Sequence, residues 1–230
     1  MSMLLRVCVV LIGLAGEVLA GGVVGRVELP RSPDRPGVVQ RGFLDRVENP
    51  LVPVRGLEVG PLLAVVLEGD AKPQAPGQVA WELAGEAFSR PLLVVPLGAE
   101  ILITNSSTVP RTLIALEDPK LVPQGALAPG SQKSFRPAEA RAYTIADPDV
   151  PHLRATLLVV NTPYIAGVDT SGGKPDAAAF QLADVAEGTY KVRVFYRDGW
   201  LDRPDDTVSV PAKRSAELTI KLPAGYPRKK

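Results

Sequence analysis

The sequence has very little sulfur and very little imidazole. Its 230 residues include one Cys, two Met and one His. The sulfur atoms belong to Met1, Met3 and Cys8, so no residue after position 8 carries one. The chain after position 8 has no thiol, so that part cannot form a disulfide, a thiolate zinc site or a Cys-His nucleophile pair. Burial of apolar side chains must therefore supply most of its stability.

The sequence also lacks an excess of charge of either sign. It has 26 Lys and Arg against 25 Asp and Glu, a formal net charge of +1. Proteins that bind nucleic acid usually carry an excess of Lys and Arg, which this sequence lacks, so we expect no nucleic-acid partner. With 46% apolar and 22% charged residues the composition is that of a globular protein. Its 23 Pro and 21 Gly favour many turns and few long helices.

The N-terminus has the pattern of an export signal. Arg6 precedes the apolar run 7–16, and Val18-Leu19-Ala20 supplies the small-residue pattern of a cleavage site. The run has about 10 residues, whereas a membrane span needs about 20. We therefore expect a signal peptide over 1–20, no membrane span after its removal, and a periplasmic or extracellular protein. The mature chain would contain no Cys and no Met, and no Cys after Ala20 could carry a lipid.

The rest of the chain is organised as short apolar runs between turn residues. The segment 23–29 is expected to be a first strand, and the Pro-rich segment 30–61 an extended arm, more plausibly an ordered loop than a partner-binding element. Further strands are predicted over 62–67, 92–95, 101–104, 112–116, 143–145 and 157–160. The segment 78–88 is ambiguous by propensity, because several helix formers are interrupted by Gly85.

The alternation of apolar and polar residues that is typical of strands is clearest in the last third of the chain. Tyr190, Val192, Val194 and Tyr196 share one face, with Phe195 as an exception, and Leu218, Ile220 and Leu222 share another. Both segments are predicted to be half-buried antiparallel strands. Trp200, in the polar stretch between them, is interpreted as a lid on the C-terminal core in preference to an exposed contact.

Several stretches, taken in order, resemble a family of exported bacterial proteins, some of them labelled methylamine utilisation proteins. They are FSRPLLVVPLGAEILITN (88–105), LAPGS (127–131), NTPYIAGVDTSG (161–172), FQLADV (180–185) and EGTYKVRVF (187–195). In that family a plastocyanin-like (cupredoxin) domain precedes a small carboxypeptidase-regulatory-like β-domain.

The resemblance implies an all-β fold with two sandwiches. A cupredoxin-like Greek-key sandwich would occupy 21–160, and a transthyretin-like, carboxypeptidase-regulatory-like sandwich would occupy 161–223. A basic tail would follow over 224–230. The resemblance also favours a strand over 78–83.

The resemblance further implies where copper ligands would lie. Cupredoxin copper is held by two His, one Cys and a weak axial Met. These positions fall on Arg111 and Val150 for the two His, near Asp147 for the Cys, and on Leu153 for the Met. We therefore expect no copper site, no metal site and no cofactor.

The single imidazole, His152, leaves two interpretations. It could join Asp147 and Asp149 in an oxygen-rich metal site, or be a solvated loop side chain, which the sequence favours. Catalytic patterns are weak. There is no G-x-S-x-G segment, the carboxylate pairs 147/149 and 205/206 lie in turn sequences, and Gly172 to Pro175 reads as a turn. No catalytic residue is therefore predicted.

These observations predict a non-enzymatic binding or scaffold protein of the cell envelope, whose partner would be another envelope protein. The alternative is copper binding or electron transfer through a non-standard site. A third possibility, a hydrolase, would require a deep pocket joining His152 to a carboxylate. The partner's identity and the oligomeric state do not follow from the sequence.

Overall fold

The computed structural model describes residues 21–28, 60–70, 76–168, 177–197, 199–201 and 206–222. The predicted signal peptide, nearly all of the Pro-rich arm and the basic tail lie outside these ranges. Within them the chain is built of β-strands with a single 3-10 turn, η1 (Gly60–Leu62), so the prediction of an all-β fold is confirmed. No described helix has the length and apolar character needed to cross a membrane.

Two four-stranded sheets form the first sandwich. One has the order β4-β3-β6-β8 and the other the order β5-β10-β9-β7. Pairs β3·β6 and β5·β10 are parallel and the remaining pairs antiparallel. The strands are β3 (Gln78–Ala84), β4 (Ala87–Phe88), β5 (Leu92–Pro96), β6 (Glu100–Asn105), β7 (Ile114–Ala115), β8 (Gln132–Phe135), β9 (Ala142–Asp147) and β10 (Val150–Val160).

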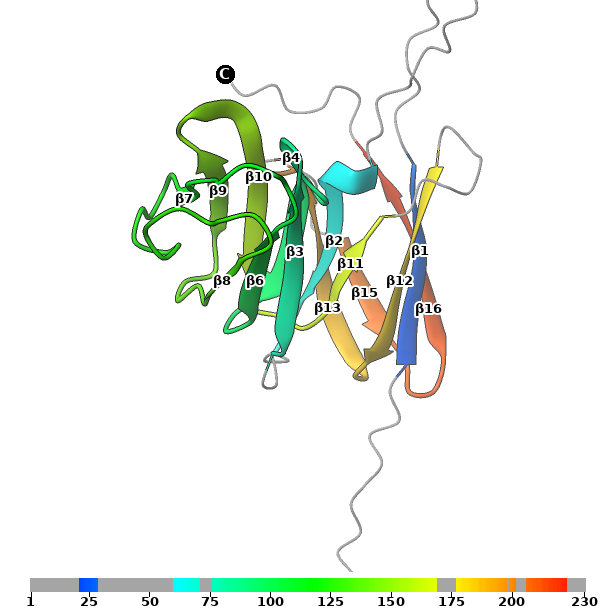
Figure 1. Cartoon of the computed structure of the whole chain (residues 1–230). Helices are drawn as coiled ribbons and strands as arrows, with labels where there is room; N and C mark the ends of the chain where they lie inside the picture. Colours follow the sequence, from blue (N-terminus) through cyan, green and yellow to red (C-terminus); the bar gives the residue numbers. More distant parts are fainter. Residues whose placement is uncertain are drawn as a thin grey trace, which may run out of the picture.

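The second sandwich lies beside the first (Figure 1). One sheet has the order β12-β1-β16, and the other has the order β11-β2-β13-β14 with β15 also paired to β13. Its strands are β1 (Gly21–Glu28), β2 (Leu63–Glu68), β11 (Ile165–Gly167), β12 (Ala177–Val185), β13 (Gly188–Tyr196), β14 (Gly199–Trp200), β15 (Asp206–Val210) and β16 (Ser215–Lys221).

The strand pairing corrects the expected division of the chain at residue 160. Strand β1 lies between β12 and β16, and β2 lies between β11 and β13, so both belong to the second sandwich. The first sandwich begins only at β3. The expected boundary was wrong because it assigned β1 and β2 to the domain that follows them directly in the sequence. Strands that pair in a sheet can lie far apart in the sequence, as these two do from their partners.

Most predicted strands are present, with two differences. Segment 78–83 forms β3, as the resemblance implied, but only Ile114 and Ala115 of segment 112–116 form a strand. Strand β13 pairs with antiparallel neighbours, whereas β16 pairs with β1 in parallel. The prediction that both C-terminal segments are antiparallel is therefore wrong for β16, since residue alternation is the same in either direction.

Three clusters of buried side chains hold the four sheets together, one inside each sandwich and one between them. We call the third the inter-sandwich cluster; its buried members are Ala64, Val66, Leu92, Leu158, Val160 and Phe195. Strands β2, β5 and β10 are therefore covered on both faces. This explains why residues 63–67 of β2, strand β5 and residues 157–160 of β10 are continuous apolar runs instead of alternating ones.

The inter-sandwich cluster also accounts for two residues of β13 and β14. Phe195 departs from the alternation of β13 because it faces the first sandwich, while Val194 and Tyr196 face the second core. Trp200 packs edge-to-face on Phe195, with ring centroids 5.2 Å apart. Trp200 therefore covers the inter-sandwich cluster, and its interpretation as a lid on the C-terminal core is wrong.

Candidate functional site

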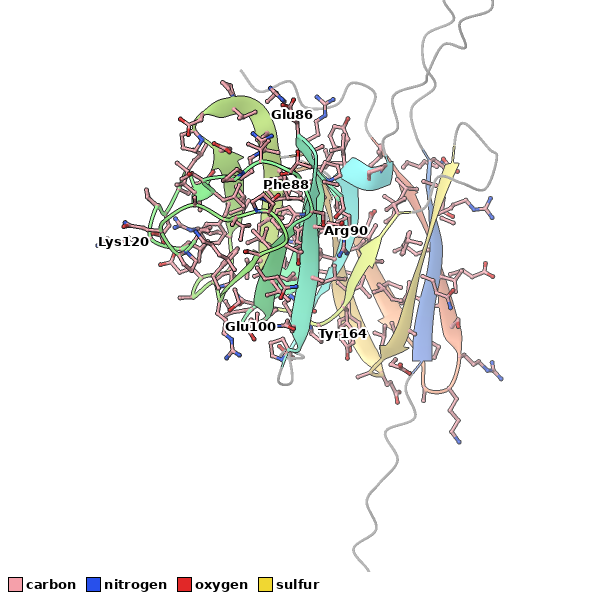
Figure 2. All side chains as sticks on the ribbon, in the orientation of Figure 1. Glu86, Phe88, Arg90, Glu100, Lys120 and Tyr164 are labelled. Carbon is pink, nitrogen blue, oxygen red and sulfur yellow. The ribbon has the colours of Figure 1, made fainter. Side chains whose placement is uncertain are left out.

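The positions expected for copper ligands lie near one end of the first sandwich. We call it the Glu86 end, after the residue labelled there in Figure 2; Glu100 is labelled at the opposite end. Asp147 and Val150 face each other across the β9–β10 turn. Leu153 is fully buried in the core of the first sandwich. Arg111, in the connection between β6 and β7, forms an isolated β-bridge with Leu127, in the connection between β7 and β8.

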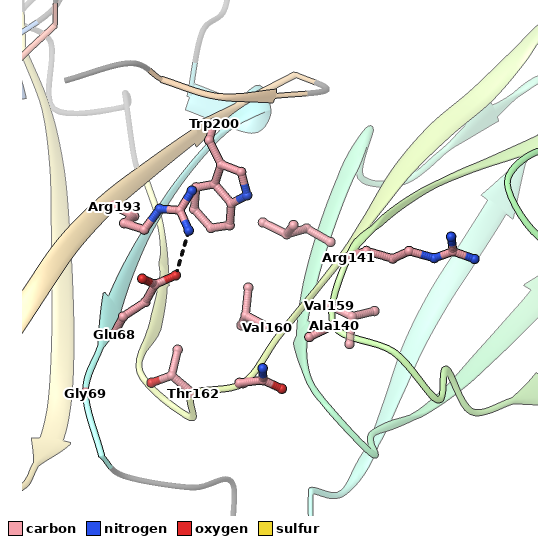
Figure 3. A pocket seen from close by; sticks show the side chains of 11 residues that line it. Glu68, Gly69, Ala140, Arg141, Val159, Val160, Thr162, Arg193 and Trp200 are labelled. Atoms are coloured by element: carbon pink, nitrogen blue, oxygen red, sulfur yellow. Dashed lines mark hydrogen bonds and ion pairs between the residues drawn. The ribbon is translucent and has the colours of Figure 1, made fainter.

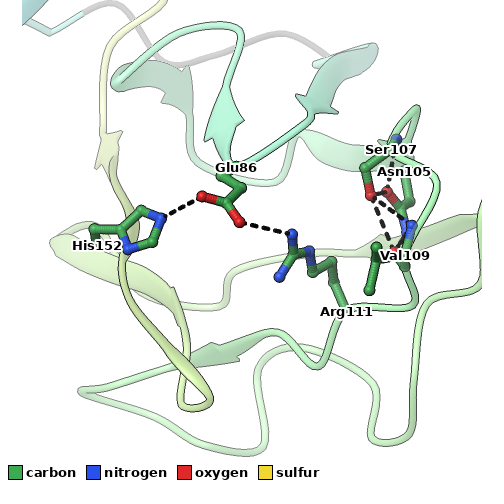
Figure 4. A network of polar contacts seen from close by, with 6 residues as sticks. All are labelled: Glu86, Asn105, Ser107, Val109, Arg111 and His152. Carbon is green, nitrogen blue, oxygen red and sulfur yellow. Dashed lines mark hydrogen bonds and ion pairs between the residues drawn. The ribbon is translucent and has the colours of Figure 1, made fainter.

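Glu86 was not identified from the sequence, although it organises this end. The tight turn between β3 and β4 contains only Gly85 and Glu86, and Gly85 has a φ of 62°. A residue without Cβ suits that left-handed conformation. The turn places the Glu86 carboxylate between His152 and Arg111 (Figure 4). His152 is 66 positions away in sequence, so no local pattern could have revealed the contact.

Arg111 carries a buried positive charge at the position where the resemblance puts a copper-binding His. Its side chain is 8% exposed, and Nη2 lies 3.8 Å from Glu86 Oε1. Its Nε is buried without a hydrogen-bond partner among the described residues. A buried guanidinium depends strongly on its counter-ion, so the Glu86 carboxylate partly offsets this charge. A guanidinium repels any metal cation brought to the same position.

His152 is held outward at the start of β10. The ladder between β9 and β10 is irregular between Val150 and Arg154, and a bulge of this kind redirects side chains. The His152 side chain is 62% exposed, and Nε2 lies 2.9 Å from Glu86 Oε2, where an imidazole N–H donates to the carboxylate. His152 is therefore exposed, as expected of a solvated side chain, but it lies in strand β10 instead of a loop and is paired with Glu86.

Asp147 and Asp149 take part in a turn. Asp147 is buried, and its Oδ1 accepts a hydrogen bond of 3.0 Å from the backbone N–H of Asp149. Among the described residues, no group of three His, Cys, Asp or Glu side chains is arranged to hold a metal ion. The residues at the expected ligand positions offer one carboxylate, one guanidinium and two aliphatic side chains. This donor set does not fit a blue-copper centre, which needs thiolate and imidazole ligands.

Asn105 fixes the loop that leads to Arg111. The residue is fully buried; its Nδ2 donates to the carbonyls of Val109 and Leu127, both at 2.9 Å. Its Oδ1 accepts from the backbone N–H of Ser107 at 3.0 Å and from Ser107 Oγ at 2.6 Å (Figure 4). The Asn105 amide is therefore a structural group that holds this loop in place.

A groove lies where the two sandwiches meet, away from the residues above, and no sequence pattern pointed to it. It has a volume of about 380 Å³. The lining residues come from both sandwiches and from the connection between them: Glu68, Gly69, Ala140, Arg141, Leu158, Val159, Val160, Asn161, Thr162, Arg193 and Trp200 (Figure 3). His152 is not among them, so this groove does not join His152 to a carboxylate as the hydrolase interpretation requires.

Comparison with known proteins gives a partial structural likeness. No family model and no curated protein matches the chain. A reduced variant of amicyanin is 16% identical and matches 42% of this chain and 98% of its own, with a TM-score of 0.33. A purple cupredoxin from Nitrosopumilus maritimus is also 16% identical, matching 35% of this chain and 98% of its own, with a TM-score of 0.32. At these TM-scores the likeness assigns no family, and the fold class rests on the strand pairing.

Proposed function

We propose that this chain is an exported, non-enzymatic binding or scaffold protein of the cell envelope, built on a cupredoxin-like sandwich that has lost its copper site. Its partner would be another envelope protein. The leader-like pattern of residues 1–20 supports export. The loops at the Glu86 end no longer need to surround a metal, so their sequence is free to serve recognition.

One observation carries this proposal. The position that the resemblance assigns to a copper-binding His holds the buried Arg111, paired with Glu86 at 3.8 Å. The position assigned to the axial Met holds Leu153, which is fully buried among apolar side chains. A cation at one ligand position and a hydrocarbon at another both oppose copper.

Copper binding measured by titration calorimetry tests the proposal. The full chain should carry Cys8→Ser, so that its single thiol cannot contribute. We expect no tight binding of Cu(II) at a ratio near one. Any weak uptake should disappear in the additional variant His152→Ala, because an exposed imidazole attracts copper adventitiously. Tight stoichiometric binding that survives His152→Ala would show that another site exists and would overturn the proposal.

A further inference from the structure

The groove between the sandwiches has the walls of a small-ligand site. Its volume of about 380 Å³ lies within the range of about 300–1,000 Å³ that such sites occupy. Leu158 and Val160, which are 1% and 5% exposed, form an aliphatic floor from β10, and Trp200 supplies an aromatic side from β14 (Figure 3). Sites of this kind often lie at interfaces between domains, where a few polar groups converge on an apolar wall.

The polar groups of the groove include both donors and acceptors. Arg193 Nη1 donates to Glu68 Oε1 at 2.9 Å, and the two side chains are 35% and 39% exposed. The Arg193 guanidinium also stacks over the Trp200 ring, 3.9 Å from its centroid. This stacking fixes the plane of the guanidinium. Its remaining N–H groups and the second Glu68 oxygen can therefore face a ligand in a defined orientation.

The groove carries no net charge at its polar end. Glu68 and Arg193 cancel one another. Arg141 contributes its stem, while its guanidinium points away from Arg193 and Trp200 (Figure 3). That guanidinium lies over the Tyr143 ring and pairs with Glu139 at 3.4 Å. An ionic ligand would gain little here, because each charge already has a partner of the opposite sign.

We propose that this groove binds a neutral saccharide. A sugar ring has hydroxyl groups that both donate and accept, and an apolar C–H face that suits the part of the half-buried Trp200 indole left uncovered by Arg193. Glu68 can accept from a hydroxyl, Arg193 can donate to one, and the exposed Asn161 amide can do either. This inference is independent of the loss of the copper site, because the groove and the Glu86 end share no residue.

Titration of the full chain with neutral sugars tests the proposal. The probes are glucose, galactose, mannose, N-acetylglucosamine, cellobiose and diacetylchitobiose, with glucuronate as the charged comparison. Binding is followed by calorimetry and by Trp fluorescence. The chain has two Trp, and Trp81 is fully buried in the first core, so a fluorescence change reports on Trp200. We expect saturable binding of at least one neutral sugar, with glucuronate binding more weakly than glucose.

Three variants locate the site. Glu68→Gln should weaken binding by about tenfold, since it removes a charged acceptor. Asn161→Ala should weaken it in the same direction with little effect on folding, because the side chain is exposed. The control is Glu100→Gln, whose carboxylate pairs with Arg136 at 3.3 Å outside the groove, and binding should be unchanged. The proposal fails if no neutral sugar binds, if glucuronate binds more tightly than glucose, or if Glu68→Gln binds as well as Glu100→Gln.

Discussion

At the scale of single residues, Asn105 is the side chain on which the Glu86 end depends most. It joins the end of β6 to Ser107, Val109 and Leu127 through four hydrogen bonds in a fully buried setting. Replacing it with Ala should lower the free energy of unfolding by about 2–4 kcal/mol, since each such bond contributes about 0.5–1.5 kcal/mol. Denaturant unfolding measures the change. The exposed neighbour Ser106→Ala is the control and should lose less than about 0.5 kcal/mol; equal losses would contradict the role given to Asn105.

Tyr190 should make stability depend on pH in the alkaline range. Burial, helped by a hydrogen bond involving Tyr164, raises the pKa of Tyr190 to about 12. In the unfolded chain the phenol ionises near pH 10. Its contribution to stability is therefore complete below about pH 10 and is lost as the pH rises towards about 12. Thermal unfolding between these limits should show a decline that is smaller in Tyr190→Phe. Identical declines in the two proteins would refute this assignment.

At the scale of elements, β1 depends on a glycine that faces the core of the second sandwich. A Cβ at Gly25 would lie 2.5 Å from the Leu218 carbonyl oxygen and would collide with the Phe180 ring. Gly25→Ala should therefore cost about 1–3 kcal/mol of unfolding free energy, as overpacking does. Gly167→Ala, in β11, is the matched control because its Cβ would meet nothing within 4 Å. Chemical denaturation compares the two; a neutral Gly25→Ala would show that β1 does not pack as described.

The strands themselves could be predicted from short apolar runs, whereas their partners could not. The runs 63–67 and 92–96 are apolar throughout because both of their faces are covered. The parallel pairing of β1 with β16, and the insertion of β2 between β11 and β13, join segments far apart in the chain. Alternation determines which residues share a face, but it carries no information on the neighbouring strand or its direction.

At the scale of the whole molecule, the two sandwiches are connected by chain crossings and by a shared cluster of buried side chains. The described residues contribute β1 and β2 to the second sandwich, then form the first with β3 to β10, and return to the second with β11 (Figure 1). The inter-sandwich cluster packs sheets from both, and the groove lies along this junction. The sequence could identify Arg111 and Leu153 through the resemblance. The groove and Glu86 could not be found in this way, because their neighbours are brought together only by folding.

The visible absorption spectrum of the chain carrying Cys8→Ser, recorded with added Cu(II), tests the central claim most directly. With Asp147 near the position expected for the Cys, and Arg111 and Leu153 at those expected for a His and the Met, we predict only the weak absorption of loosely bound copper, which is lost when excess metal is removed. A visible copper band that persists at a ratio near one copper per chain after removal of excess metal would contradict the account.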